Sequence, residues 1–221
     1  MKQRSMESSK RLNTVLTYVF LILGALIMVF PFVWMILTSL KTVPESMEVP
    51  PTIFPKELIV SNFGEAIKSL PFAKLYWNTG LMIVFRVICA VLFSSMAGYA
   101  FAMLEFKGKG LLFGIVLVQM SLPSQIFIIP QYQMVAKMGL ANTIFALVFP
   151  GLVSAFGVFF LRQTYMGIPN EVAEAAYLDG CNQWQTFYKV MFPLTGTSVA
   201  ALTIFTAVFA YSDLMWPLVV N

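Results

Sequence analysis

Two charged side chains, Arg86 and Asp213, stand inside long apolar runs of the sequence. A charge within a membrane segment is costly, so it is usually paired with an opposite charge or turned toward water. Each lies roughly 10–14 Å, at ~1.5 Å per residue, from the outer end of its predicted helix. We therefore expect the two to form an ion pair, to line a transport pathway, or to contact a solute directly. Gln119 and Gln125 are weaker pathway candidates, because amide side chains also hold membrane helices together.

The residue types that the chain lacks exclude several kinds of active site. Its 221 residues include no histidine, which removes the commonest general base and metal ligand. No phosphate-binding P-loop is present, since the glycines and lysine of 108–110 lack the required spacing. Cys89 and Cys181 fall in segments of different kinds, so we expect no disulfide between them. We therefore predict no catalytic residue, no metal site and no cofactor bound by this chain.

The longest polar interval in the second half of the chain is Glu171–Pro193. Asn170 is expected to cap a first helix, and Gly180 to end that helix in the left-handed region. Asn182 then caps a second helix, with Gln185 in the position of a capping box. The interval therefore predicts a helix, a glycine turn and a second helix. Two interpretations remain open on these residues alone: a docking surface for another protein, and an ordinary helical hairpin at the membrane surface.

The charged and polar residues described above belong to a chain that is mostly apolar. Hydrophobic residues make up 59% and charged residues 11%, whereas soluble domains carry about 25% charged residues. The mean hydropathy is +0.81, which indicates an all-α integral membrane protein with several spans. The first apolar run is too long for a signal peptide, so we predict a retained first span. The five predicted spans cover residues 14–40, 76–103, 111–130, 143–161 and 194–220.

The predicted helices carry their own packing and breaking signals. Four small residues recur at every fourth position of the second span, where they allow another helix to approach closely; they are Ala90, Ser94, Gly98 and Ala102. Pro123 is expected to interrupt the third span. In the proline-rich outer loop 41–75, Ser61 or Asn62 is expected to cap a short helix.

The lysines and arginines predict the orientation, because cytoplasmic ends of spans are enriched in them. With a cytoplasmic N-terminal tail (1–13), eight of them are cytoplasmic, namely Lys2, Arg4, Lys10, Arg11, Lys107, Lys109, Arg162 and Lys189. Five are external, namely Lys41, Lys56, Lys68, Lys74 and Lys137. This bias places loop 162–193 in the cytoplasm. The net charge of +4 reflects these topology signals, so we expect no nucleic-acid partner.

The polar interval contains a spaced pattern. It consists of Glu174, Ala175 and Ala176, then Gly180, then Val190, Phe192 and Pro193. This pattern resembles the EAA motif of permease subunits of binding-protein-dependent ABC importers, with valine and phenylalanine in place of isoleucine and leucine. Further stretches are similar to the maltose-type carbohydrate permeases across roughly the whole chain; among them are residues 51–55, 61–63, 150–152, 156–159 and 213–218.

The resemblance implies the type I ABC importer permease fold, with residues 76–221 of this chain as the permease core. That family usually has six spans, and this chain reaches Asn221 with five, so a further segment is expected in the family pattern. By the resemblance, Glu174, Ala175 and Ala176 pack into a cleft of a cytoplasmic ATPase subunit. Gly180 makes the turn, and the second helix is anchored to the fifth span by three residues, Val190, Phe192 and Pro193.

The same resemblance implies the partners and the mechanism. The partners are a dimer of ATPase subunits, a second permease, an extracytoplasmic binding protein and membrane lipid, with ATP and Mg on the ATPase. The implied function is carbohydrate import across a bacterial cytoplasmic membrane by alternating access. A secondary transporter or channel is the alternative, but it predicts inverted repeats and ion-coupling acids, where this sequence has one broken helix and one membrane acid. An intramembrane enzyme lacks the usual catalytic groups.

Overall fold

The computed structural model describes residues 2–220, with the side chains of residue 11 and of residues 13–220. All regular elements in this range are helices, and no strand occurs among the described residues. The chain divides into two compact units, Met1–Phe72 and Ala73–Asn221, which are described one at a time. The expectation of an all-helical protein is confirmed.

The first unit consists of one long helix and a short, ordered segment that follows it. Helix α1 (Lys2–Ser39) includes the apolar stretch Asn13–Ser39, which is long enough to cross a bilayer and in which no described residue is buried. Helix α2 (Val43–Ser46) is capped by the Thr42 hydroxyl, which accepts a hydrogen bond from the Glu45 backbone N–H at 3.2 Å. Helix α3 (Ser61–Ser69) completes the unit.

The segment between α1 and α3 is held together by buried polar groups. The Glu45 carboxylate is buried and accepts hydrogen bonds from the Thr52 hydroxyl at 3.0 Å and the Lys56 backbone N–H at 2.9 Å. The Lys41 amine is also buried, and it donates to the Thr52 carbonyl. Because buried charges require such partners, these bonds fix the path of a proline-rich loop that has few apolar contacts of its own.

The expected cap of α3 was wrong. Val60 precedes the helix, and no side chain of Ser61 or Asn62 caps it. The Asn62 amide instead donates to the carbonyls of Ser39 and Lys41, at 2.9 Å each. These carbonyls lie at the end of α1 and two residues beyond it, where a helix leaves backbone acceptors without partners, so Asn62 bonds to the end of α1 rather than capping α3.

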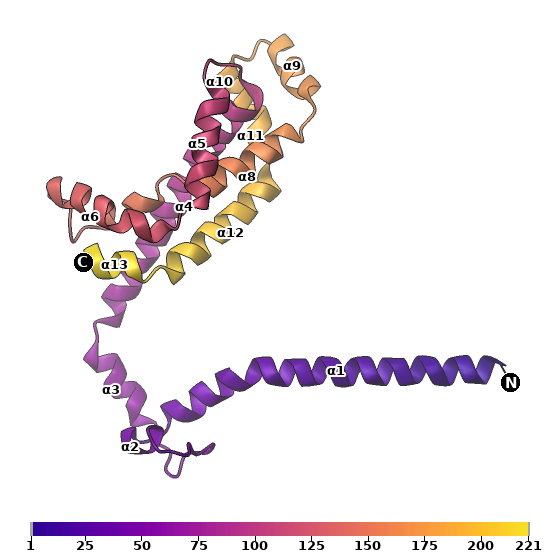
Figure 1. The fold of residues 1–221 in the computed structure, drawn as a ribbon, viewed down its shortest axis with the longest axis vertical. Coiled ribbons are helices and arrows are strands. Elements are labelled where there is room, and N and C mark those ends of the chain that lie inside the picture. Colours follow the sequence, from indigo (N-terminus) through magenta and orange to yellow (C-terminus); the bar gives the residue numbers. More distant parts are fainter. Residues whose placement is uncertain (1, 221) are drawn as a thin grey trace. The chain divides into compact units, whose positions relative to one another are not determined.

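In the second unit α4 (Phe72–Met103) and α8 (Ala155–Met166) come into close contact at small residues. A Cβ atom on Gly98 would lie 2.9 Å from the backbone nitrogen of Arg162, and one on Gly157 would lie 2.6 Å from the Ser94 hydroxyl. The expectation that small residues of the second span admit a neighbouring helix is therefore confirmed. Helices α5 (Lys109–Ser121) and α12 (Gly196–Ser212) also pack on α8 (Figure 1).

Several of the predicted spans are bent in the structure. Helix α5 ends before Pro123, and the chain continues through η1 (Ser124–Phe127) into α6 (Ile128–Lys137) at an angle of 104°. This confirms Pro123 as a helix breaker. A bend of 48° also separates α8 from the preceding α7 (Ile144–Val148) and η2 (Phe149–Gly151), where Pro150 removes a backbone donor. The sequence did not predict this second break.

The last third of the chain is also broken into pieces. It contains α9 (Asn170–Leu178), α10 (Gln183–Gln185), the π-helix η3 (Thr186–Met191), α11 (Phe192–Leu194), α12 and α13 (Met215–Val220). Between α11 and α12 the axis bends by 78°. Figure 1 shows α9 and α10 at one end of this unit, and α6 and α13 toward the other.

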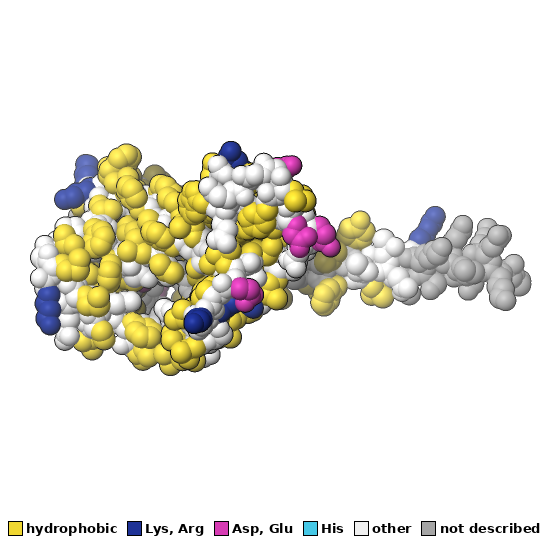
Figure 2. All heavy atoms as spheres, turned by 90° about the horizontal axis from the view of Figure 1, so that it is seen from above, with side chains coloured by type: hydrophobic (Ala, Val, Ile, Leu, Met, Phe, Trp, Pro, Cys, Tyr) yellow, Lys and Arg dark blue, Asp and Glu magenta, His cyan; other side chains and the backbone are white. Residues whose placement is uncertain are grey.

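The apolar surface of the structure agrees with a membrane environment. Two of the described helices are long and apolar enough to cross a bilayer, and the number rises to five if each of three bent pairs is one span. Figure 2 shows apolar side chains spread widely over the described surface, with few charged ones among them. Within the second unit, buried residues form one cluster near α7 and α13 and another between α4, α8 and η3.

Candidate functional site

Arg86 and Asp213 form an ion pair in the second unit. The Arg86 Nη1 atom lies 3.0 Å from Asp213 Oδ2, and the two side chains are 9% and 26% exposed. They come from helices that are far apart in the sequence, so the pair joins α4 to the end of α12. The expected pairing is therefore confirmed.

The backbone conformation at Asp213 explains why its carboxylate can reach Arg86. Helix α12 ends at Ser212, and Asp213 adopts an extended conformation (φ −75°, ψ 107°) before α13 begins. Its second oxygen accepts a hydrogen bond from the Trp216 backbone N–H at 3.4 Å. The Asp213 side chain therefore caps the start of α13. The sequence predicted one helix through this point, and the break is what turns the acid toward Arg86.

A glycine makes room for the arginine. A Cβ atom on Gly151 would lie 2.5 Å from Arg86 Nε, so the guanidinium lies directly over this residue. Any larger residue at 151 therefore forces the Arg86 side chain to shift.

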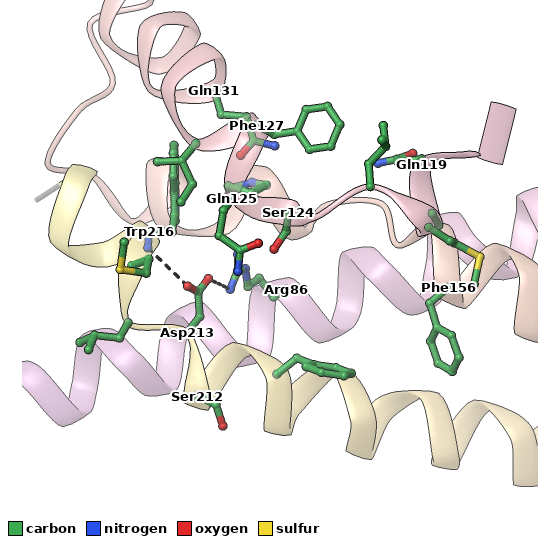
Figure 3. A pocket seen from close by; sticks show the side chains of 18 of the residues that line it. Arg86, Gln119, Ser124, Gln125, Phe127, Gln131, Phe156, Ser212, Asp213 and Trp216 are labelled. Atoms are coloured by element: carbon green, nitrogen blue, oxygen red, sulfur yellow. Dashed lines mark hydrogen bonds and ion pairs between the residues drawn. The ribbon is translucent and has the colours of Figure 1, made fainter. Parts of the chain in front are cut away.

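The ion pair borders a cavity of about 770 Å³. All four pathway candidates, Arg86, Gln119, Gln125 and Asp213, line it, although they come from four different segments (Figure 3). The bend after α5 brings this about, because it carries Gln125 back toward the helices that hold the ion pair. Other polar side chains at the cavity are Ser124, Gln131 and Ser212, and large aromatic ones are Phe127, Phe156, Phe205, Phe209 and Trp216.

The lining suits a neutral, hydroxyl-bearing solute. Amide and hydroxyl groups both donate and accept hydrogen bonds, and flat aromatic rings offer apolar contact area. The two charges compensate each other, so the cavity has no net charge to select an ion. Among the described residues no three His, Cys, Asp or Glu side chains are placed to share a metal ion. The arrangement can bind a solute through hydrogen bonds and apolar contact.

Some lining residues were missed by sequence reasoning. Gln131 was read as part of a polar link, yet it lies in α6 and faces the cavity (Figure 3). Trp216 was noted only for family resemblance, and its indole N–H donates to the buried carbonyl of Ala146 at 2.8 Å. The signal that identifies Trp216 is its position three residues after Asp213, the spacing of a helix cap and the residue it caps.

The segment with the EAA-like pattern forms the expected helix, glycine turn and helix. Gly180 has φ +81°, and its N–H bonds the Tyr177 carbonyl while the Cys181 N–H bonds the Ala176 carbonyl, both at 3.0 Å. These two bonds are the Schellman pattern that ends a helix. Asn182 and Gln185 form the predicted reciprocal capping box, at 2.8 and 2.9 Å. Asn170 was wrongly predicted as a cap: it is the first residue of α9, and Pro169 precedes it.

Three residues of the pattern meet at a shallow groove of about 450 Å³. These are Ala175, Ala176 and Val190, and the carboxylates of Glu171 and Asp179 lie on the same groove. Glu174 is exposed on α9 outside it, and Pro193 is also exposed. Phe192 packs inward, with its ring 5.9 Å from that of Phe187. The groove therefore presents small apolar side chains beside acids, which suits a basic, convex partner surface.

The groove is connected to the membrane helices by a buried aromatic cluster. Phe187 of the π-helix η3 lies 5.2 Å from the ring of Tyr99 in α4, which packs edge-on against Tyr165 of α8 at 5.6 Å. The Tyr165 hydroxyl shares a hydrogen bond of 2.6 Å with Ser95. Because close-packed interiors transmit displacements, a shift of η3 must be accommodated by α4 and α8.

Comparison with known proteins places this geometry in a family. Residues 90–221, which include the groove, the π-helix and Asp213, match the model of the binding-protein-dependent transport system inner membrane component. The chain belongs to this family. The expected resemblance to permease subunits of ABC importers is thereby confirmed, and the chain is a transport component rather than an enzyme.

Curated members of the transport family are similar over most of the chain. The arabinooligosaccharides transport system permease protein AraQ of Halalkalibacterium halodurans is 38% identical over 202 residues, which cover 89% of this chain and 71% of AraQ. The lactose transport system permease protein LacG of Rhizobium radiobacter is 27% identical over 211 residues, which cover 96% of this chain and 77% of LacG.

A solved structure has the same fold. A chain in the crystal structure of a bacterial ABC transporter involved in the import of the acidic polysaccharide alginate superposes with a TM-score of 0.79 at 23% identity. The match covers 96% of this chain and 75% of that one. The expected type I ABC permease fold is therefore confirmed for this member of the transport family.

Proposed function

We propose that this chain is the membrane-spanning permease subunit of an ATP-driven importer, and that its solute is a carbohydrate. The observation that carries this proposal is the cavity beside Arg86 and Asp213. Its lining combines amides, hydroxyls and aromatic rings with two charges that compensate each other, and this combination matches a sugar. The names of AraQ and LacG, an oligosaccharide and a disaccharide permease protein, support the same solute class. Arg86, Gln119, Gln125 and Asp213 are then part of the translocation pathway.

The energy source is a separate ATPase that docks on loop 162–193. In this proposal Glu174 and the groove residues Ala175, Ala176 and Val190 contact the ATPase, and Gly180 sets the angle between the two short helices. Closure of an ATPase dimer on ATP and Mg displaces α9. The displacement passes through η3 and the aromatic cluster to α4 and α8, and it opens the cavity to alternate sides of the membrane.

The proposal also assigns the surroundings of the chain. It lies in a bacterial cytoplasmic membrane with segment 1–13 in the cytoplasm, pairs with a second permease, and receives its solute from an extracytoplasmic binding protein. The permease core is 76–221, and loop 41–75 connects the first two spans on the outer side.

The test uses two glycines with the same local geometry. Gly180 and Gly139 have φ values of +81° and +69°, and each donates its N–H at 3.0 Å to the carbonyl three residues earlier. Proline at either position loses this bond and imposes a negative φ, so the local cost is matched. Only Gly180 belongs to the loop that we propose docks the ATPase.

The complex is purified through a tag on this chain from the cells that produce it and is placed in lipid vesicles. We expect Gly180→Pro to reduce solute-stimulated ATP hydrolysis and sugar uptake by about 5- to 150-fold, the range of typical coupling free energies. Gly139→Pro should leave both solute-stimulated hydrolysis and uptake near those of the unaltered chain. Equal losses in both variants, or unchanged hydrolysis and uptake in Gly180→Pro, would refute the role of the loop. Hydrolysis that responds to no neutral saccharide of a test panel would refute the solute class.

A further inference from the structure

Helix α3 carries an apolar stripe that no described side chain covers. Phe63 and Ile67 lie one turn apart on α3, and Val60 and Leu70, the residues that flank the helix, continue the same sequence spacing; the four are 50%, 66%, 68% and 52% exposed in that order. Polar residues, including Glu65 and Lys68, occupy the opposite side. A continuous exposed apolar surface of this kind marks a membrane or protein contact rather than a face in water.

The start of α3 is tied to the end of an apolar helix. The Asn62 amide donates to the carbonyls of Ser39 and Lys41 at 2.9 Å, and the Ile59 N–H donates to the Leu40 carbonyl at 2.9 Å. Helix α1 ends at Ser39, after an apolar stretch that is long enough to cross a bilayer. The first turn of α3 is therefore held where α1 leaves the membrane.

The other end of α3 leads directly into the next apolar helix. Helix α3 ends at Ser69 and α4 begins at Phe72, so only two residues separate them. Tyr76 and Trp77 stand in the first turns of α4, and such aromatic residues are enriched at membrane–water interfaces. Consecutive spans leave and enter the membrane on the same side, so both ends of α3 belong to one membrane surface.

We infer that α3 is an interfacial helix, lying along the surface of the bilayer with this apolar stripe inserted at the boundary between headgroups and acyl chains. A helix fixed to one membrane surface at both ends, with one apolar and one charged side, satisfies the physical requirements for that position. Lys68 on the polar side then faces the phosphates and the water. The inference does not depend on the transported solute or on the ATPase.

The test measures the depth of single positions in lipid. Cysteines are placed one at a time at Phe63 and Ile67 on the stripe and at Glu65 and Lys68 on the polar side, in a chain that carries Cys89→Ala and Cys181→Ala. Each variant is labelled with an environment-sensitive fluorophore and reconstituted in phosphatidylcholine vesicles. Some vesicles contain lipid with a nitroxide high on the acyl chain, and others contain lipid with a nitroxide deep in the bilayer.

We expect the labels at 63 and 67 to lose fluorescence to the shallow nitroxide and to lose less to the deep one. Labels at 65 and 68 should be quenched by iodide from the water instead. Val60→Cys and Leu70→Cys give a second pair if either central variant fails to fold. Equal lipid quenching on both sides overturns the inference, as does iodide access at 63 and 67. Lipid and iodide both failing to reach 63 and 67 indicates a protein cover and also overturns it.

Discussion

Gly98 of α4 and Leu161 of α8 approach so closely that a Cβ atom on the glycine would lie 3.1 Å from the Cβ of Leu161. The same added atom would lie 2.9 Å from the Arg162 backbone nitrogen, which belongs to a rigid helix and cannot rotate away. The contact between the two helices therefore depends on the absence of a side chain at this position.

We predict that Gly98→Val destabilises the protein by about 1–3 kcal/mol, the usual cost of overpacking a core. Gly80 is the matched control, because it lies in the same helix and has no atom within 4 Å of an added Cβ. Gly80→Val should change stability by less than about 0.5 kcal/mol, since only helix propensity differs. Thermal unfolding of the two detergent-purified variants checks this, and similar midpoints for both would show that α4 and α8 are not in close contact.

The ion pair gives a second prediction. Arg86→Ala and Asp213→Ala should each cost about 3 kcal/mol, the lower end of the range for breaking a buried pair, because Asp213 is 26% exposed. The charge swap Arg86→Asp with Asp213→Arg should recover part of this loss. Unfolding midpoints measure the pairing, and a swap as unstable as either single variant would contradict it.

Transport by the same three variants separates a structural role from contact with the solute. If the pair only joins α4 to the end of α12, uptake should recover in the swapped variant together with stability. If one of the two groups binds solute, stability recovers while the half-saturating solute concentration stays raised. The comparison needs uptake measured over a range of concentrations in vesicles with equal amounts of folded protein.

A third prediction concerns the hydrogen bond between Ser95 and Tyr165. Both residues are fully buried, and their hydroxyls lie 2.6 Å apart. Tyr165→Phe leaves the serine hydroxyl without this partner, so it should cost about 1–3 kcal/mol. The double variant with Ser95→Ala should cost less than the sum of the single variants, because it removes both polar groups. A double-mutant cycle on unfolding free energies measures the difference, and strict additivity would mean that the bond contributes nothing.

Much of the candidate site followed from local chemistry in the sequence. Gly180, Asn182 and Gln185 were correctly assigned because turn and cap preferences depend on a few neighbouring residues. The pairing of Arg86 with Asp213 was also correct, since an unpaired charge in lipid is costly enough to dictate its partner. Pro123 was recognised as a break for the equally local reason that it lacks an N–H.

What the sequence did not predict depends on contacts between distant segments. The break after Ser212 is stabilised by a local bond of Asp213 to the Trp216 backbone and by its bond to Arg86, which only the folded chain brings near. Asn62 was assigned to the wrong helix, because its competing acceptors at the end of α1 lie more than 20 residues away. The π-helix η3 has no sequence signature of its own, and its Phe187 and Met191 are buried in a cluster formed with α4 and α8.

The π-helix η3 places one more residue between the groove and α12 than an α-helix of the same axial length would hold. A π turn closes its hydrogen bond one residue later than an α turn, so six residues of Thr186–Met191 span less axial length than they would as α-helix. Rewinding this turn into an α turn advances the following residue by about 100° and about 1.5 Å. Helices α9 and α11 both pack against η3, so a displacement of α9 would reach this turn before it reached α12.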